Sequence, residues 1–219
     1  DPGGYSQFVR VPRINVEHGV YVLPEQVTYD EGTMIEPLAC AVRALRLMDI
    51  RPGQTVLILG GGISGILNIQ VAKLAGARVV VTDINEYRLK KALEFGADDV
   101  IDARQAVDVK AERIILCTGA YSAVEQAFRC LDRKGILLLF AIPAKDIAVP
   151  IPDFWRNEGR LMSSYGAAPE DLAEALELIS ERRVDVASTI THRLPMARIQ
   201  EAFDIVVGAK ESLKVVLEP

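Results

Sequence analysis

The sequence has few of the residues that build disulfide frameworks or compact metal motifs. It contains three cysteines, Cys40, Cys117 and Cys130, with no C-x-x-C spacing among them, and two histidines that lie far apart. This pattern excludes a disulfide-stabilised scaffold and a self-contained zinc motif. No apolar run approaches the roughly 18 residues that span a bilayer, and the opening DPGGYSQ lacks the charged and apolar regions of a signal peptide. We therefore expect a cytoplasmic protein with no membrane partner.

A strong charge of one sign is also missing. The net charge is −5, spread along 219 residues rather than gathered in blocks. Such a distribution argues against nucleic acid or an anionic membrane as a partner. Half the residues are apolar and a quarter are charged, as in globular proteins. The length allows one large domain, or one domain and part of another.

What the sequence does have is a buried strand that runs into a glycine turn. Thr55–Leu59 is apolar after its first residue, as expected of a strand covered on both faces of a parallel sheet. Gly60, Gly62 and Gly65 then match G-x-G-x-x-G, and helical spacing continues over Ile66–Leu74. In that motif the glycines allow a tight turn, approach of the backbone to a pyrophosphate, and close packing of helix on strand. The helix N-terminus then faces the phosphates. The candidate cofactor-binding residues of the turn are Gly60, Gly62, Ile63, Ser64 and Gly65.

A second strand with an acidic end gives this motif its context. Arg78–Thr82 is followed by Asp83, 18 residues past Gly65, close to the spacing at which a carboxylate binds a ribose 2′-hydroxyl. Asp83 favours NAD over NADP, because a 2′-phosphate would meet its negative charge. Arg88 weakens this preference, since a nearby arginine can accommodate that phosphate. Arg88 either packs near the adenine or is an arginine on the helix surface.

Strand and helix patterns alternate from Thr55 onward, which predicts an α/β fold with a doubly wound parallel sheet of six strands. The further strands are expected at Asp99–Asp102, Arg113–Cys117, Gly135–Ala141 and Arg160–Tyr165, and the further helices at Glu86–Phe95, Ser122–Leu131 and Pro169–Ser180. In such folds the ligand lies at the carboxyl ends of the strands.

The two ends of the chain do not fit this alternation. Before the sheet, residues 3–12 and VYVLP read as short strands, Thr28-Tyr-Asp-Glu31 as a capping box, and residues 34–45 as a helix with a break near Pro37. After the sheet, Thr189–Arg193 and Leu213–Leu217 read as strands flanking a helix at Met196–Val207. We expect the last segment to return to an incomplete β-rich domain at the N-terminus.

The chain resembles the zinc-containing medium-chain alcohol dehydrogenases, and most closely their sorbitol (L-iditol) and threonine dehydrogenase branch. The matching stretches are GGYSQFVRVP (3–12), MIEPLACAVRAL (34–45), VLILGGGISG (56–65), VVVTDINEYRL (79–89), CTGA (117–120), THRLPM (191–196) and LKVVL (213–217). The resemblance implies a Rossmann coenzyme domain at 46–182, between remnants of a GroES-like catalytic domain at 1–45 and 183–219. It also implies oxidation of a secondary alcohol, polyol or threonine-like, by hydride transfer to NAD.

The resemblance assigns roles to five further residues. Glu36 falls where this branch places a glutamate at the catalytic zinc, so it is both the catalytic and the metal candidate. Thr118 and Gly119 fall on the loop beside the coenzyme, and Ile142 near the nicotinamide. Lys214 falls where relatives direct a basic residue to the pyrophosphate, the alternative being a solvated terminal lysine.

The family's other zinc ligands have no counterpart in these residues. A catalytic zinc takes about three protein ligands, and Glu36 alone cannot supply them. We therefore expect this chain to be mainly the coenzyme-binding portion, which binds NAD but is inactive alone, with zinc belonging to the intact enzyme.

Other readings of the same motifs have weaker support. Tyr87 and Lys91 match the Y-x-x-x-K pair of short-chain reductases but lie on the wrong helix, and a methyltransferase cofactor has no pyrophosphate for the three glycines. The remaining alternative is an isolated dinucleotide-binding or oligomerisation module without activity. A homodimer or homotetramer through the coenzyme domain could use the apolar residues 136–152, which are otherwise sheet core followed by a loop.

Overall fold

A six-stranded parallel sheet forms the centre of the protein. The computed structural model describes residues 4–219, apart from the side chain of His18. The sheet contains β1 (Thr55–Leu59), β2 (Arg78–Asp83), β3 (Asp99–Asp102), β4 (Ala111–Leu116), β5 (Leu131–Leu139) and β6 (Arg160–Ser163). Their order in space is β3-β2-β1-β4-β5-β6, and every neighbouring pair is parallel. This is the doubly wound Rossmann order, so the predicted fold class is confirmed for this part of the chain.

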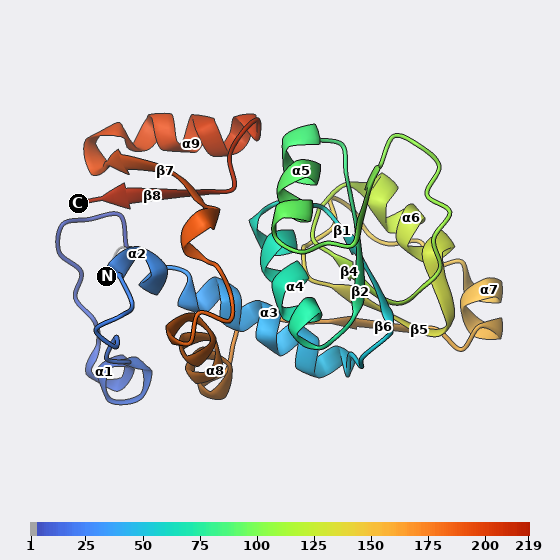
Figure 1. The fold of residues 1–219 in the computed structure, drawn as a ribbon, viewed down its shortest axis with the longest axis horizontal. Helices are drawn as coiled ribbons and strands as arrows, with labels where there is room; N and C mark the ends of the chain where they lie inside the picture. The colour runs from blue at the N-terminus through green and yellow to red at the C-terminus, as the bar shows by residue number, and fades with distance from the viewer. Residues whose placement is uncertain (1–3) are drawn as a thin grey trace.

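Helices cover both faces of the sheet. They are α4 (Ile63–Leu74), α5 (Glu86–Glu94), α6 (Tyr121–Cys130) and α7 (Ile151–Arg156). Because strand side chains alternate, Val56 and Ile58 of β1 pack with α4 and α5, whereas Leu57 and Leu59 pack with α6. Figure 1 shows α4 and α5 on one side of the sheet and α6 on the other. The uniformly apolar β1 is therefore explained by burial on both faces.

Three helices connect this sheet to the rest of the chain. They are α2 (Tyr29–Gly32), α3 (Ile35–Met48) and α8 (Pro169–Ser180). The predicted capping box is present, because Thr28 and Glu31 exchange hydrogen bonds at the start of α2. The predicted break lies at Thr33 and Met34 instead of at Pro37. Pro37 sits in the first turn of α3, where a missing N–H costs nothing.

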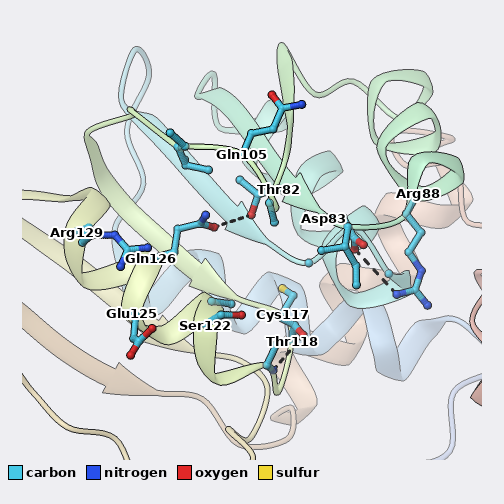
Figure 2. A pocket seen from close by; sticks show the side chains of 18 residues that line it. Thr82, Asp83, Arg88, Gln105, Cys117, Thr118, Ser122, Glu125, Gln126 and Arg129 are labelled. Carbon is cyan, nitrogen blue, oxygen red and sulfur yellow. Dashed lines mark hydrogen bonds and ion pairs between the residues drawn. The ribbon is translucent and has the colours of Figure 1, made fainter.

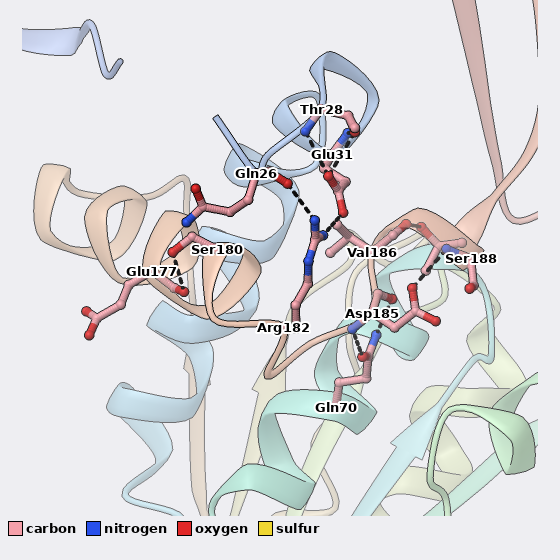
Figure 3. Close-up of polar contacts among 11 residues, drawn as sticks. Gln26, Thr28, Glu31, Gln70, Glu177, Ser180, Arg182, Asp185, Val186 and Ser188 are labelled. Carbon is pink, nitrogen blue, oxygen red and sulfur yellow. Dashed lines mark hydrogen bonds and ion pairs between the residues drawn. The ribbon is translucent and has the colours of Figure 1, made fainter. Parts of the chain in front are cut away.

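An arginine after α8 ties this helical region together (Figure 3). Arg182 donates one hydrogen bond to the carboxylate of Glu31 and another, of 2.5 Å, to the carbonyl of Gln26. Nearby, the side-chain amide of Gln70 on α4 exchanges two hydrogen bonds with the backbone of Asp185. These bonds join segments more than a hundred residues apart and satisfy polar groups at their junction.

The C-terminal segment forms a second, two-stranded sheet. β7 (Ile190–Pro195) follows the 3₁₀ turn Ala187–Thr189 and pairs in parallel with β8 (Lys214–Glu218). The turn Met196–Arg198 and α9 (Ile199–Gly208) connect the two strands. Figure 1 shows this unit set apart from the large sheet, with the C-terminus at the end of β8.

The N-terminal segment differs from the prediction of two short strands. Residues 4–12 and 20–24 have no strand conformation, and Arg13–Gly19 forms the helix α1; Gly3, the first residue of the predicted strand, lies outside the described residues. A strand needs a neighbour for its backbone hydrogen bonds, and residues 4–12 join neither of the two sheets. Tyr5 instead makes an edge-on ring contact with Phe203 of α9, with centroids 5.9 Å apart. Among residues 4–219, no helix is long and apolar enough to cross a membrane.

Candidate functional site

The glycine turn lies where the carboxyl ends of three strands meet. The N–H of Gly60 donates to the carbonyl of Thr82 at 2.8 Å, and the N–H of Cys117 donates to the carbonyl of Leu59 at 2.8 Å. These bonds hold the ends of β1, β2 and β4 together. Gly60 has φ +105°, a backbone conformation open to glycine but strained for other residues. The turn therefore needs glycine at its first position.

The two other motif glycines meet different surroundings. A Cβ on Gly65 would lie 2.0 Å from the carbonyl oxygen of Gly60, so α4 could not pack this closely on the turn with any other residue. A Cβ on Gly62 would meet nothing nearer than Cζ of Arg88, at 3.8 Å. Space is thus left open in front of Gly62, where the motif brings a phosphate to the backbone. The residues present fit a dinucleotide at this turn.

Asp83 is held against the same turn. Its Oδ2 accepts from the N–H of Gly61 at 2.7 Å, and its Oδ1 accepts from the N–H of Asn85 at 2.9 Å. The side chain is only 8% exposed, yet it borders a pocket of about 600 Å³. A carboxylate fixed by two backbone N–H groups keeps lone pairs for a ligand in that pocket.

Arg88 lies over the turn from α5. Its Nη1 is 4.0 Å from Oδ2 of Asp83. Its Nε is buried and has no hydrogen-bond partner within the described part of the chain. A buried donor without a partner is costly, which favours an acceptor in the space beside it. Arg88 borders both the large pocket and a smaller one of about 230 Å³.

Seven of the predicted cofactor-binding residues line these two pockets. Gly60, Gly62, Asp83, Arg88 and Thr118 line the large pocket, and Ile63 and Ser64 line the smaller one. Figure 2 shows Asp83, Arg88 and Thr118 around the large pocket, together with side chains from α6.

The other predicted residues lie elsewhere. Gly65 is buried beneath the turn. Gly119 packs against the loop after β5, where its carbonyl accepts a hydrogen bond from the N–H of Ala144. Ile142 is 91% exposed on that loop. Lys214 is half-buried at the start of β8 and does not line these pockets.

Glu36 is exposed on α3, away from both pockets. Its Oε1 accepts a hydrogen bond from the thiol of Cys40 at 3.3 Å. Burial and then this bond raise the pKa of Cys40 to about 12, so the thiol is neutral at pH 7. Within residues 4–219, leaving aside the His18 side chain, no three His, Cys, Asp or Glu side chains gather to hold a metal. The described residues do not by themselves fit a zinc ion.

The motifs did not indicate the part of the pocket formed by α6 and by the loop after β3. Ser122, Glu125, Gln126 and Arg129 line it from α6, and Gln105 lines it from the loop. One signal was available in the sequence. Gln126 interrupts the apolar stripe of Ala123, Ala127 and Cys130 on α6, and a polar residue on a buried stripe often has a partner.

Fold and site together define the class of protein: a Rossmann domain with a glycine turn and an acid at the end of its second strand. The sequence model described as Zinc-binding dehydrogenase matches residues 64–181, more than half of the chain. The chain belongs to the zinc-binding dehydrogenase family, which confirms the resemblance.

The relatives are polyol and alcohol dehydrogenases. Sorbitol dehydrogenase of Halalkalibacterium halodurans is 31% identical, over 99% of this chain and 66% of its own length. Sorbitol dehydrogenase of Gallus gallus is 29% identical, over 90% of this chain and 59% of its own. Across the curated relatives, this chain spans 55% to 66% of their length.

Solved structures share the arrangement. A zinc-binding dehydrogenase from Sinorhizobium meliloti 1021, bound to NADP, superposes with a TM-score of 0.87 at 25% identity, over 99% of this chain and 66% of that one. Alcohol dehydrogenase TADH from Thermus sp. ATN1 superposes with a TM-score of 0.88 over 99% of this chain and 66% of that one; at 22% identity it shows the fold alone.

Proposed function

We propose that this chain is the coenzyme-binding part of an NAD-dependent dehydrogenase that oxidises a secondary alcohol. The observation that carries the proposal is the Asp83 carboxylate. It is buried at the glycine turn, bonded to the Gly61 N–H at 2.7 Å, and borders the large pocket. A carboxylate at this position suits the two hydroxyls of an adenosine ribose. The sorbitol dehydrogenases among the relatives support a polyol-type alcohol as the substrate; a threonine-like alcohol is the alternative that the sequence resemblance implies.

The choice of NAD over NADP depends on two opposed charges. A 2′-phosphate would place negative charge against Asp83, whose oxygens already accept two backbone hydrogen bonds. Arg88, with its unpaired Nε, offers a counter-charge 4.0 Å away, and the Sinorhizobium meliloti relative is bound to NADP. Asp83 is hydrogen-bonded directly to the turn backbone, at 2.7 Å from the N–H of Gly61, and is therefore fixed where the ribose would lie. We infer that its charge outweighs that of Arg88 and that the chain prefers NAD.

Exchange of the acid tests this inference. In the double variant Asp83→Gly and Ile84→Arg, the charge that opposes a 2′-phosphate is removed and a positive one is added. Fluorescence titrations with NADH and NADPH should then show the preference move toward NADPH. Asp146→Gly, which removes an exposed carboxylate outside the pocket, serves as the control and should keep the wild-type preference. Unchanged affinities in the double variant would show that Asp83 does not set the choice.

The five residues assigned by resemblance keep their proposed roles. Thr118, Gly119 and Ile142 would lie along the coenzyme, with Lys214 toward the pyrophosphate. Glu36 is proposed to belong to the zinc environment of an intact enzyme. Since the described residues do not form a zinc site, no step of the reaction follows from them.

The second candidate function is a dinucleotide-binding or oligomerisation module without activity of its own. It is favoured by the finding that the described residues do not form a zinc site. Fusion of this chain to the remaining residues of a sorbitol dehydrogenase relative separates the two candidates. Turnover of sorbitol by the fusion with NAD and zinc favours the main proposal, and NADH binding without turnover favours the second. The three-part division at residues 1–45, 46–182 and 183–219, with GroES-like remnants at both ends, belongs to the main proposal. So do a cytoplasmic location and a homodimer or homotetramer formed through the coenzyme domain.

A further inference from the structure

The inner wall of the large pocket carries a pair of buried polar side chains. Thr82, the penultimate residue of β2, is 1% exposed, and Gln126 of α6 is 6% exposed. The hydroxyl of Thr82 donates to Oε1 of Gln126 at 3.1 Å. Both side chains border the pocket, and Figure 2 shows their bond between Asp83 on one side and Arg129 on the other.

Most hydrogen-bonding groups of the Gln126 side-chain amide have no partner among the described residues. A primary amide has two donor hydrogens and two acceptor lone pairs, and among the described residues Gln126 makes only the bond from Thr82. The core on this face of the sheet is apolar and includes Leu59, Val80 and Val124. A buried amide in such surroundings is costly unless its remaining groups find partners. The donor hydrogens and one lone pair are left for a ligand in the pocket.

Adenine has the complementary groups. Its N6 amino group donates and its neighbouring N7 accepts, and a glutamine amide pairs with both through two parallel hydrogen bonds. If Asp83 holds the adenosine ribose, the attached base enters the rest of the same pocket, toward Gln126. Ile84, 64% exposed and also lining the pocket, offers the base an apolar surface.

We propose that Gln126 selects the adenine base of the dinucleotide by a bidentate hydrogen bond to N6 and N7. Thr82 acts as a positioning residue, because its hydroxyl holds Oε1 and so fixes which side of the amide donates. The inference rests on the proposed function and adds to it the residue that distinguishes one base from another.

Replacement of adenine by hypoxanthine changes one of the two bonds. Hypoxanthine has an acceptor oxygen in place of the N6 amino group, so Oε1 of Gln126 would face another acceptor. A bidentate contact of this kind discriminates by about ten- to a hundredfold in affinity. Wild-type chain should therefore bind reduced nicotinamide hypoxanthine dinucleotide about ten- to a hundredfold more weakly than NADH.

The test is the ratio of the two dissociation constants, measured by calorimetry for the wild type and three variants. In Gln126→Leu the ratio should fall to about one. In Thr82→Val nothing holds Oε1 in place, and a flipped amide would face both N6 and N7 of adenine with the wrong groups, whereas the two acceptors of hypoxanthine do not distinguish the two orientations. The ratio should therefore fall through a loss of NADH affinity. Gln200→Leu makes the same substitution at an exposed position on α9 outside the pocket, and should keep the wild-type ratio.

The outcomes separate this inference from the proposed function. Equal binding of the two dinucleotides by the wild type, which requires no variant, overturns the role of Gln126 alone. So does an unchanged ratio in Gln126→Leu. Absence of NADH binding by the wild type overturns the proposed function and this inference with it.

Discussion

The substitution Gly65→Ala tests the packing of the glycine turn. The new Cβ would lie 2.0 Å from the Gly60 carbonyl oxygen, whereas real Cβ atoms essentially never approach closer than 3.0 Å. Helix α4 must therefore shift by at least 1.0 Å, the difference between those two distances. The carbonyl belongs to the backbone of a turn tied to β2, so it cannot simply rotate away. Overpacking of this kind costs about 1–3 kcal/mol.

Helix propensity acts against the clash in this variant, because it favours alanine over glycine and so would stabilise Gly65→Ala. Gly65 lies inside α4, where alanine is favoured over glycine by about 1 kcal/mol. Any loss of stability in Gly65→Ala must then come from the clash. Urea unfolding followed by far-ultraviolet circular dichroism measures the change in the free energy of unfolding.

Gly62→Ala is the matched control in the same motif. Its Cβ would meet nothing nearer than 3.8 Å, so the stability of the free chain should change little. The methyl group would instead occupy the space where a pyrophosphate approaches, and NADH affinity should fall. If Gly65→Ala is as stable as the wild type, or if Gly62→Ala loses as much stability as Gly65→Ala, the division of roles between the glycines is wrong.

Two further predictions concern charge and metal. Burial of Glu31 opposes its ionisation, but hydrogen bonds from Thr28 and Arg182 outweigh burial and hold the pKa of this carboxyl below its usual 4.5. Because the pKa is lowered in the folded state, the stabilisation is present above pH 4.5 and is lost as the pH falls through the folded pKa. Glu31→Gln should thus be less stable than the wild type at pH 7 and show a shallower loss below pH 4.5, and equal acid profiles in urea titrations would contradict this. Elemental analysis of the purified 219-residue chain after dialysis against zinc should find well under one zinc per chain, since the described residues gather no set of three ligands. One tightly held zinc per chain would contradict this and show that the chain holds a zinc site.

Local patterns predicted the centre of the Rossmann-like sheet because its signals lie close together in the sequence. The strand Thr55–Leu59, the glycine spacing and Asp83 fall within 29 residues; the structure forms β1 over this strand and ends β2 at Asp83, which accepts a hydrogen bond from the glycine turn. Strand ends were less predictable. β5 begins at Leu131 and includes three charged residues before Gly135, since pairing with β4 across a register shift decides where it starts.

Contacts between distant residues could not be read from such patterns. Thr82 and Gln126 are 44 residues apart, and Glu31 and Arg182 are 151 apart. Their side chains meet only because the sheet order and helix packing bring them together. The N-terminal strands failed for a related reason, because alternation of apolar residues predicts a strand only where another strand can pair with it.

We propose above all that the glycine turn and Asp83 hold a dinucleotide. Calorimetric titration of the purified wild-type chain with NADH, with ADP-ribose as a competitor, tests it most directly. One NADH should bind per chain, more tightly than NADPH, and should be displaced by ADP-ribose, which carries the same adenosine ribose and pyrophosphate. Absence of binding heat, or binding that ADP-ribose does not displace, would contradict it.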